Sequence, residues 1–307
     1  MSPSVSGPTR KARAFAPGHV TGLFVPSTGA RDPRARGSLG AGVVLEAGVR
    51  AEAEWRPGPR LRVRLTSDLG RPLEISEEVA RRLAPAGTGT LSVTVRHTLP
   101  VGQGFGTSAS GALATALAVA RVSGRSRSKA VEVAHLADLF GGGGLGGVAA
   151  ILGGGLEVRA RPGIPPFGEI LRRPFRDSLL LGIAGAPIPT PTVLNDRKTL
   201  ARIAAAAVGL GDLTRDPSPE RFWDASEAFT DRAGLAPREL RDLLRGLRSR
   251  GARGAQAMFG RSFFAQLPTD ERRRDTLLWM ARRGVPAIEL SAASQGAHGS
   301  RLPSRVA

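Results

Sequence analysis

Cysteine and tyrosine are both absent from this chain of 307 residues, and aromatic residues make up 5% of it. Without cysteine the chain can form no disulfide bond, no Cys-ligated zinc site and no thiol nucleophile. The scarcity of aromatic rings also leaves little surface on which the bases of single-stranded nucleic acid could stack. Any metal site must therefore use oxygen or imidazole ligands.

Long apolar runs are also missing. Stretches such as SLLLGIAGA at 178–186 are short and followed by proline, whereas a membrane-spanning helix needs roughly 20 apolar residues. The opening MSPSVSGPTRKARAFAPG carries basic residues without the apolar run of a secretory signal. Since 41% of the residues are hydrophobic, the chain can still bury a substantial core. We expect a soluble, cytoplasmic, globular protein without membrane contact.

Positive charge is in excess, with 44 lysine and arginine residues against 26 acidic ones and a formal net charge of +18. Such a surface attracts nucleic acid phosphates, which makes a nucleic-acid-binding module one alternative. The arginines are scattered over many short segments, however, and arginine, alanine, glycine and proline are all abundant together. The charge favours a basic solvated surface, and we expect no specific nucleic acid partner.

The first half of the chain has the alternation of apolar and polar residues that is typical of half-buried strands. This pattern predicts strands within 43–55, 61–67 and 91–100. From Ser108 the period changes, and residues 108–122 are alanine-rich and apolar on nearly all sides. That composition predicts a buried helix directly after a glycine-rich turn.

The second half interleaves predicted helices and strands without a regular βαβ repeat, which predicts an α+β fold in two lobes. Helices are expected in 197–211, 237–251 and 269–284, and strands in 178–186 and 285–291. The proline-rich segment 163–169 is the predicted boundary. We therefore expect a disordered basic tail at 1–12, an N-terminal lobe at 13–165, a C-terminal α+β lobe at 166–295 and a frayed tail at 296–307.

The most informative segment is PVGQGFGTSAS at 100–110, between a predicted strand and the buried helix. Glycines let the backbone approach a ligand closely, and the first turn of a helix offers unpaired N–H groups to an anion. The alternative is a plain strand-to-helix turn that Ser108 caps. The residues expected to cradle phosphate are Pro100, Gly102, Gly104, Gly106, Thr107, Ser108 and Ala109.

This loop resembles the P-x-x-x-G-L-G-S-S-A motif of GHMP kinases, with Phe105 in place of leucine and Thr107 in place of the first serine. Two further segments resemble archaeal pantoate kinases of coenzyme A biosynthesis. The first is AFAPGHVTG at 14–22 together with GSLGAGV at 37–43, and the second is AMFGRSFFA at 257–265. The three segments occur in the family's order over most of the chain.

The resemblance implies a two-lobed GHMP-kinase-like fold with a nucleotide-binding N-terminal lobe and ATP at the glycine loop. It also implies Mg²⁺ held by phosphate oxygens, the Ser108 hydroxyl and a carboxylate, for which Asp138 stands where the family has glutamate. The reaction implied is transfer of the γ-phosphoryl group to the primary alcohol of pantoate, giving 4-phosphopantoate. ATP and pantoate are thus the expected small-molecule ligands.

The chain departs from the family where T-G-L-G-D-V reads GGLGGV at 143–148. Gly147 replaces the aspartate that would orient or deprotonate the alcohol. The catalytic candidates are therefore Ser108, Asp138 and His19, the last as a replacement for that aspartate. The alternatives are a GHMP kinase for another small alcohol and a nucleotide-binding homologue that has lost catalysis. The oligomeric state stays open, with a homodimer among the alternatives.

Overall fold

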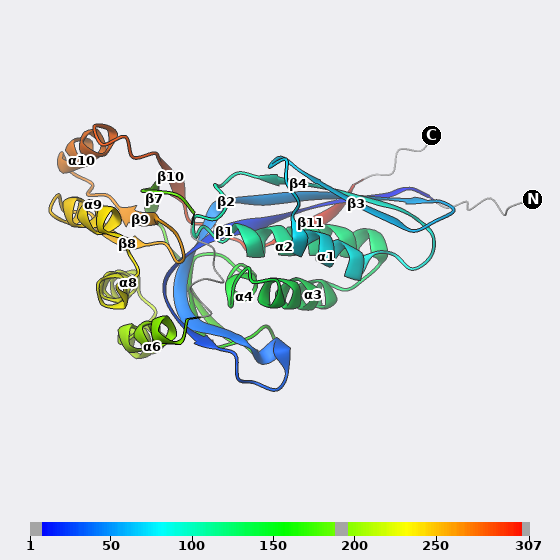
Figure 1. The fold of residues 1–307 in the computed structure, drawn as a ribbon, viewed down its shortest axis with the longest axis horizontal. Coiled ribbons are helices and arrows are strands. Elements are labelled where there is room, and N and C mark those ends of the chain that lie inside the picture. The colour runs from blue at the N-terminus through cyan, green and yellow to red at the C-terminus, as the bar shows by residue number, and fades with distance from the viewer. Residues whose placement is uncertain (1–7, 188–195, 303–307) are drawn as a thin grey trace, which may run out of the picture.

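The computed structural model describes residues 8–187 and 196–302, which form two sheets with associated helices (Figure 1). The larger sheet has seven strands, in the order β11-β1-β2-β4-β3, with β5 paired to β2 and β6 paired to β5. Its strands are β1 (Arg10–Ser27), β2 (Gly37–Pro57), β3 (Arg62–Ser67), β4 (Gly89–His97), β5 (Leu156–Arg161), β6 (Glu169–Arg173) and β11 (His298–Leu302). A 3-10 helix, η1 (Pro33–Ala35), lies between β1 and β2.

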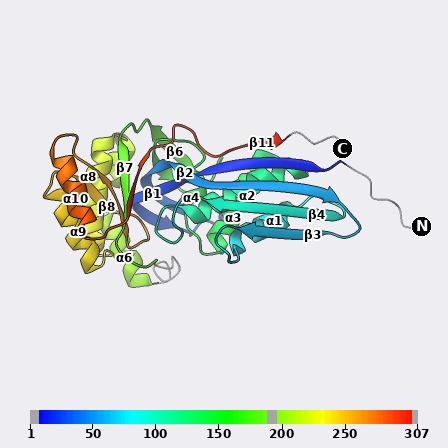
Figure 2. The same ribbon diagram turned by 90° about the horizontal axis from the view of Figure 1, so that it is seen from above.

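Helices cover one face of this sheet and flank a second, four-stranded sheet at its end (Figures 1 and 2). The helices of the first group are α1 (Glu74–Leu83), α2 (Thr107–Ser123), α3 (Arg127–Phe140) and α4 (Gly147–Ala150). The second sheet has the order β10-β7-β9-β8, from β7 (Ser178–Ile183), β8 (Arg253–Gln256), β9 (Ser262–Gln266) and β10 (Ala287–Ser291). The remaining helices are α6 (Arg197–Ala206), α7 (Leu210–Arg215), α8 (Pro219–Ala233), α9 (Arg238–Arg248) and α10 (Arg272–Ala281).

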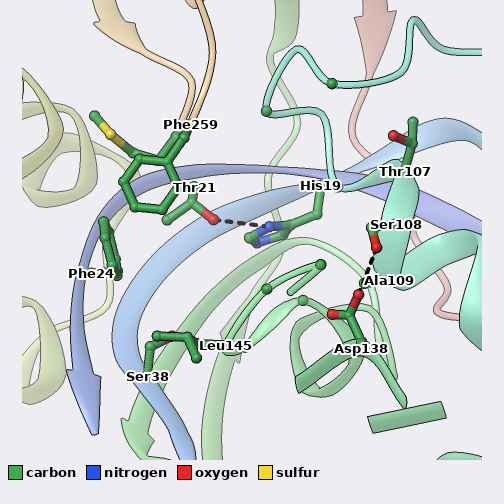
Figure 3. A pocket seen from close by; sticks show the side chains of 18 of the residues that line it. His19, Thr21, Phe24, Ser38, Thr107, Ser108, Ala109, Asp138, Leu145 and Phe259 are labelled. Carbon is green, nitrogen blue, oxygen red and sulfur yellow. Dashed lines mark hydrogen bonds between the residues drawn. The ribbon is translucent and has the colours of Figure 1, made fainter. Parts of the chain in front are cut away.

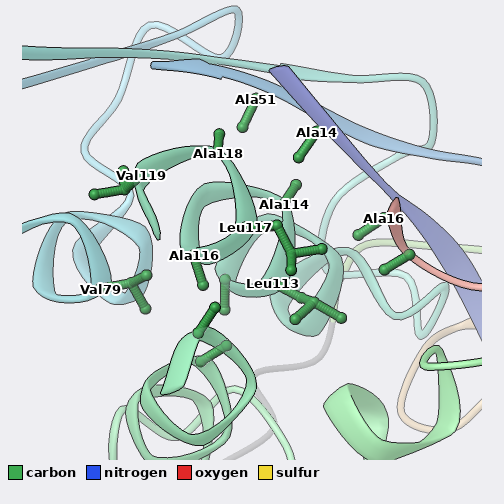
Figure 4. Close-up of a cluster of buried hydrophobic side chains, with 14 of the residues drawn as sticks. Ala14, Ala16, Ala51, Val79, Leu113, Ala114, Ala116, Leu117, Ala118 and Val119 are labelled. Atoms are coloured by element: carbon green, nitrogen blue, oxygen red, sulfur yellow. The ribbon is translucent and has the colours of Figure 1, made fainter. Parts of the chain in front are cut away.

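The first hydrophobic core is built around α2, which packs on β1, β2, α1 and α3. Small side chains on both partners, such as Ala114 and Ala118 on the helix and Ala14 and Ala51 on the strands, bring the helix close to the sheet (Figure 4). Leu113 lies fully buried in this cluster. The alanine-rich segment is thus a buried helix, as its sequence predicts.

The long strand β1 contributes to two cores and joins them. Ala12, Ala14 and Ala16 belong to the first core, whereas Val20 and Phe24 belong to a second core beneath α6 and α8. The pairing of β1 with β2 shifts register between Pro17 and Gly18 and again between Thr21 and Leu23. Such irregularities re-aim side chains, and these two flank His19 at the junction of the cores.

The α+β class is confirmed, and strands and helices occupy the segments where periodicity predicted them. None of the helices in the described ranges is long and apolar enough to cross a membrane.

The predicted tails are wrong where the structure describes them. Residues 10–12 already belong to β1, and 298–302 form β11, whose Leu302 pairs with Lys11. Strand pairing orders these polar segments because each supplies the other's backbone hydrogen bonds. The division into lobes at residue 165 stays a prediction, although β6 follows that residue and still pairs with β5 of the larger sheet.

The α2 core should dominate the stability of the larger sheet. Replacing Leu113, which is fully buried, with alanine should lower the free energy of unfolding by about 2–5 kcal/mol, because a cavity adds to the lost burial. Leu61→Ala is the matched control, since Leu61 is 52% exposed, and its effect should stay within about 0.5 kcal/mol. Chemical denaturation measures both, and equal losses would contradict this assignment of the core.

Candidate active site

One hollow is lined by all three sequence motifs and lies where β1 passes between the two cores (Figure 3). Its walls come from β1, β2, the glycine loop, α3, the 143–147 segment, β5 and the turn after β8. The lining residues are His19, Thr21, Phe24, Ser38, Val101, Gly102, Gly104, Gly106, Thr107, Ser108, Ala109, Asp138, Gly143, Gly144, Leu145, Gly146, Gly147, Arg159, Met258 and Phe259. Of the predicted cradle residues, Pro100 alone is absent from this lining.

The glycine loop packs backbone against backbone. Gly104 and Gly106 have φ values of +74° and +70°, which favour glycine. A methyl group built on Gly104 would lie 2.8 Å from the carbonyl oxygen of Ala257, and one on Gly106 would lie 3.0 Å from the backbone of His19. The His19 N–H donates to the Phe105 carbonyl over 3.1 Å. Side chains at these glycines would separate the loop from its neighbours.

The first turn of α2 opens without a side-chain cap. Gly106 is the N-cap residue, so the predicted alternative of a turn capped by Ser108 is wrong. The Ser108 hydroxyl instead donates to Asp138 Oδ1 over 2.7 Å (Figure 3). The N–H groups at the start of α2 are therefore left for an anion, as the positive end of the helix dipole favours.

Asp138 is a buried carboxylate at the edge of the hollow, with 2% of its surface exposed. Burial raises its pKa to about 7, although the hydrogen bond from Ser108 opposes that rise. A methyl group built on Gly143 would collide with both Asp138 Oδ1 and Ser108 Oγ. The glycine at 143 thus leaves room for the pair.

His19 is held by both ring nitrogens. Its Nε2 lies 2.9 Å from Glu157 Oε1 and its Nδ1 lies 3.3 Å from the Thr21 hydroxyl. Burial lowers the pKa of His19, although the carboxylate of Glu157 opposes this. In the neutral ring Nε2 carries the proton, because an ionised carboxylate can only accept, and Nδ1 accepts from Thr21. The ring therefore orients the Thr21 hydroxyl.

Glu157 and Arg159 are functional candidates that sequence reasoning missed. Burial alone would raise the pKa of Glu157, but the Arg159 charge and the His19 hydrogen bond hold it below its usual value. Arg159 pairs with Glu157 and is 3% exposed, and its Nε has no hydrogen-bond partner within the described residues. The sequence did carry a signal, because Glu157 and Arg159 are oppositely charged residues two positions apart in a predicted strand after the glycines at 153–155. Residues with that spacing lie on the same face of a strand.

Segment 143–147 connects the two ends of the hollow. Gly144 lies beside Asp138, with a methyl group built there 3.5 Å from Asp138 Oδ2. A methyl group on Gly146 would lie 2.6 Å from Ser38 Oγ and 2.9 Å from Arg159 Nε. Two Cα–Cα steps separate Gly144 from Gly146, so their α-carbons lie at most roughly 7.6 Å apart. The short segment therefore contacts both the Asp138 end and the Arg159 end of the same hollow.

Gly147 begins α4, so the position where the family motif has aspartate carries no side chain. Asp138 is the one carboxylate among the described residues that line the hollow. A methyl group built on Gly147 would lie 2.6 Å from the Ala109 side chain, so a larger residue would require α4 to shift. The aspartate expected from the family motif therefore has no carboxylate substitute among the described lining residues, and the role of His19 as its replacement stays a prediction.

Comparison with known proteins decides the family. The family described as "GHMP kinases N terminal domain" matches residues 74–155. The pantoate kinase of Thermococcus kodakarensis is 35% identical over 266 residues, which cover 84% of this chain and 88% of that protein. The chain belongs to the pantoate kinase family of GHMP kinases. The resemblance predicted from the three motifs is thereby confirmed.

Solved structures agree with this membership. A structure named "Phosphotransferase related to CoA biosynthesis pathway" is 30% identical, with a TM-score of 0.85, and the match covers 97% of this chain and all 100% of the other. A mevalonate-3-kinase from Thermoplasma acidophilum, bound to mevalonate 3-phosphate and ADP, is 13% identical with a TM-score of 0.64 over 97% of this chain and 100% of its own. The second likeness shows a shared fold alone.

The raised pKa of Asp138 predicts a stability difference that depends on pH. Between about pH 4 and 7 the folded protein keeps a proton on Asp138 that the unfolded chain has released, so raising the pH through this window favours unfolding. Asp138→Asn removes this titration. The variant should gain stability over the parent by about 2–4 kcal/mol from pH 4 to pH 7. Chemical denaturation at several pH values measures the free energy of unfolding of both proteins. A difference between them that does not change with pH would contradict the raised pKa of Asp138.

Proposed function

We propose that this member of the pantoate kinase family transfers the γ-phosphoryl group of ATP to the primary alcohol of pantoate, producing 4-phosphopantoate for coenzyme A biosynthesis. One observation carries the proposal: the hollow has an anion cradle with a carboxylate at one end and a buried guanidinium group at the other. A small hydroxy acid fits this arrangement, because its alcohol can face the phosphates while its carboxylate faces the cation.

ATP would bind with its phosphates on the loop 102–109. The loop offers backbone N–H groups at the start of α2, and its glycines let the phosphates approach. The ADP bound to the Thermoplasma acidophilum mevalonate-3-kinase, which shares this fold, supports nucleotide binding. Pro100 belongs to the turn that precedes this loop and would act by shaping it.

Mg²⁺ fits the donor set at the cradle. Ser108 Oγ and Asp138 Oδ1 are oxygen atoms 2.7 Å apart beside the loop, and Mg²⁺ in kinases binds one or two carboxylates together with substrate phosphates. The described residues contain no group of three or more acidic or histidine side chains that could hold a metal without substrate. When bound, the ion would neutralise charge that develops on the phosphates. Its approach would also favour the ionised form of Asp138.

Arg159 and Ser38 would bind the acid end of pantoate. Arg159 keeps a buried Nε–H without a partner among the described residues, and Ser38 Oγ lies on the same side of the hollow, next to Gly146. A carboxylate would satisfy this donor with a charge-assisted hydrogen bond. Glu157 orients the guanidinium group and offsets its charge while the site is empty of substrate.

The transfer itself needs mainly positioning. The alcohol oxygen attacks the γ-phosphorus as the bond to the leaving ADP oxygen breaks, and in a loose transition state the alcohol keeps its proton until late. That proton can pass to a phosphoryl oxygen. We therefore assign Asp138 and Ser108 to the phosphate side, and His19 to orientation of Thr21 at the wall between the two ends.

A turnover panel tests the function directly. ADP release with pantoate should exceed that with mevalonate or homoserine. The analogue 2,2-dimethyl-1,3-propanediol keeps the alcohol but lacks the carboxylate that Arg159 would bind, so its kcat/KM should fall by at least about 100-fold. Preference for another alcohol would instead favour the alternative of a different GHMP kinase. Nucleotide binding without turnover on any alcohol would favour the non-catalytic homologue.

Gly147→Asp tests whether the missing aspartate limits the rate. General-base assistance is typically worth roughly 10²–10⁴-fold, so a carboxylate in register should make turnover at least as fast as in the parent. Gly147→Asn is the matched control, because it makes the same contact with Ala109 without the charge. A gain with aspartate alone would show that nothing has replaced the lost carboxylate. A folded Gly147→Asp variant slower than Gly147→Asn would contradict the proposed register.

A further inference from the structure

One wall of the hollow takes no part in the proposed phosphate and carboxylate contacts. That wall is apolar and consists of Phe24 from β1 with Met258 and Phe259 from the turn after β8. The rings of Phe24 and Phe259 meet edge to face, with centroids 5.0 Å apart and an interplanar angle of 89°. In Figure 3 both rings lie across the hollow from Ser108 and Asp138. The apolar wall is therefore separated from the Ser108–Asp138 pair by the open space of the hollow, where an acceptor would lie.

The apolar wall adjoins the guanidinium group of Arg159. A methyl group built on Gly40 would lie 2.7 Å from Arg159 Nη2 and 2.8 Å from the α-carbon of Phe24. Phe24 and Arg159 both pair with Gly40, so their side chains project from the same face of the sheet. A bound molecule that pairs its carboxylate with Arg159 would therefore hold its neighbouring carbons on the face that carries Phe24. An unbranched polar chain would gain little binding free energy at this wall. A branched hydrocarbon group would gain more, because the contact removes its apolar surface from water.

The side chains of the apolar wall are also held by packing against their neighbours. Phe24 is 4% exposed and packs edge to face on Phe229, with ring centroids 5.9 Å apart. Met258 is 8% exposed, and its N–H lies 3.4 Å from the carbonyl oxygen of Thr21. A wall held in place before binding can select shape without first ordering its own side chains.

We infer that Phe24, Met258 and Phe259 form a subsite for the carbon of the acceptor that bears two methyl groups, and that this contact selects pantoate over unbranched hydroxy acids. The inference rests on the proposed function and deepens it. Contact of the methyl groups with the wall would also fix the direction of the neighbouring primary alcohol. Since one methylene in an apolar pocket changes kcat/KM by roughly 10–200-fold, two methyl groups supply substantial selectivity.

The test compares pantoate with 2,4-dihydroxybutanoate, which has the same carboxylate and alcohols but lacks both methyl groups. The parent should prefer pantoate by at least about 100-fold in kcat/KM. In Phe259→Ala the ratio of kcat/KM for pantoate to kcat/KM for 2,4-dihydroxybutanoate should fall at least about 10-fold. The fall should come from a lower kcat/KM for pantoate, with the value for 2,4-dihydroxybutanoate unchanged. Phe259 is the better position to change, because it is only partly buried, whereas Phe24 belongs to the second core.

Phe15→Ala is the matched control, since Phe15 lies on the same strand but its ring packs on Arg50 outside the hollow. The preference of Phe15→Ala for pantoate over 2,4-dihydroxybutanoate in kcat/KM should equal that of the parent. The melting temperature and its rise with ATP show that each variant folds and binds nucleotide, and Phe24→Leu provides a second, smaller change in the apolar wall. Pantoate turnover with a ratio that neither wall variant alters would overturn the subsite alone. Failure of the parent to phosphorylate pantoate would overturn the proposed function and the subsite together.

Discussion

The site depends on close packing of three backbone segments that carry glycine where side chains would keep them apart. Gly106 lies on the backbone of His19, Gly104 lies on the carbonyl group of Ala257, and Gly260 lies on that of Gln103. The hydroxyl of Ser262 donates to the same Gln103 carbonyl. These contacts join β1, the loop before α2 and the turn after β8, which are far apart in the chain. The hollow exists because they meet.

Burial of charge follows from that packing. Asp138, Glu157 and Arg159 are each nearly or fully buried, and an isolated charge in such a place would be costly. Glu157 is compensated by Arg159 and His19, which is why its pKa stays low. Burial raises the pKa of Asp138 toward neutrality, because among the described residues its carboxyl group is hydrogen-bonded only by the hydroxyl of Ser108. The pKa values of the two carboxylates therefore shift in opposite directions: Glu157 is paired with charged and polar neighbours, whereas Asp138, beside the glycine loop, has no cationic side chain among its described neighbours.

Sequence reasoning predicted the parts of the fold that local pattern determines. The alternating strands, the alanine-rich helix and the glycine loop each carry their signal within a short window. It failed for β11, because the pairing of Leu302 with Lys11 depends on residues at opposite ends of the chain. The alternative in which Ser108 caps α2 was wrong for the same reason, since the partner of Ser108 is Asp138 on another helix. Motif matching named His19 but could not show that Glu157 and Thr21 occupy both of its ring nitrogens.

The same limit applies to the side of the hollow that we propose binds the acceptor. Ser38, Arg159 and Phe24 become neighbours only because β1, β2 and β5 lie side by side around Gly40. Their residue types were visible in the sequence, but their convergence was not. What remained predictable was the chemistry of the cradle, because a glycine loop and the helix that follows it are contiguous in the chain.

We propose that this site transfers phosphate by position and charge, although Gly147 stands where the resemblance to GHMP kinases implies a catalytic aspartate. Phosphorus NMR of ATP, Mg²⁺ and pantoate with the protein tests it most directly. Our account predicts one new phosphomonoester on pantoate for every ADP formed, with little free phosphate. ADP and free phosphate without phosphorylated pantoate would show that water, not the alcohol, is positioned for attack, and would contradict the account.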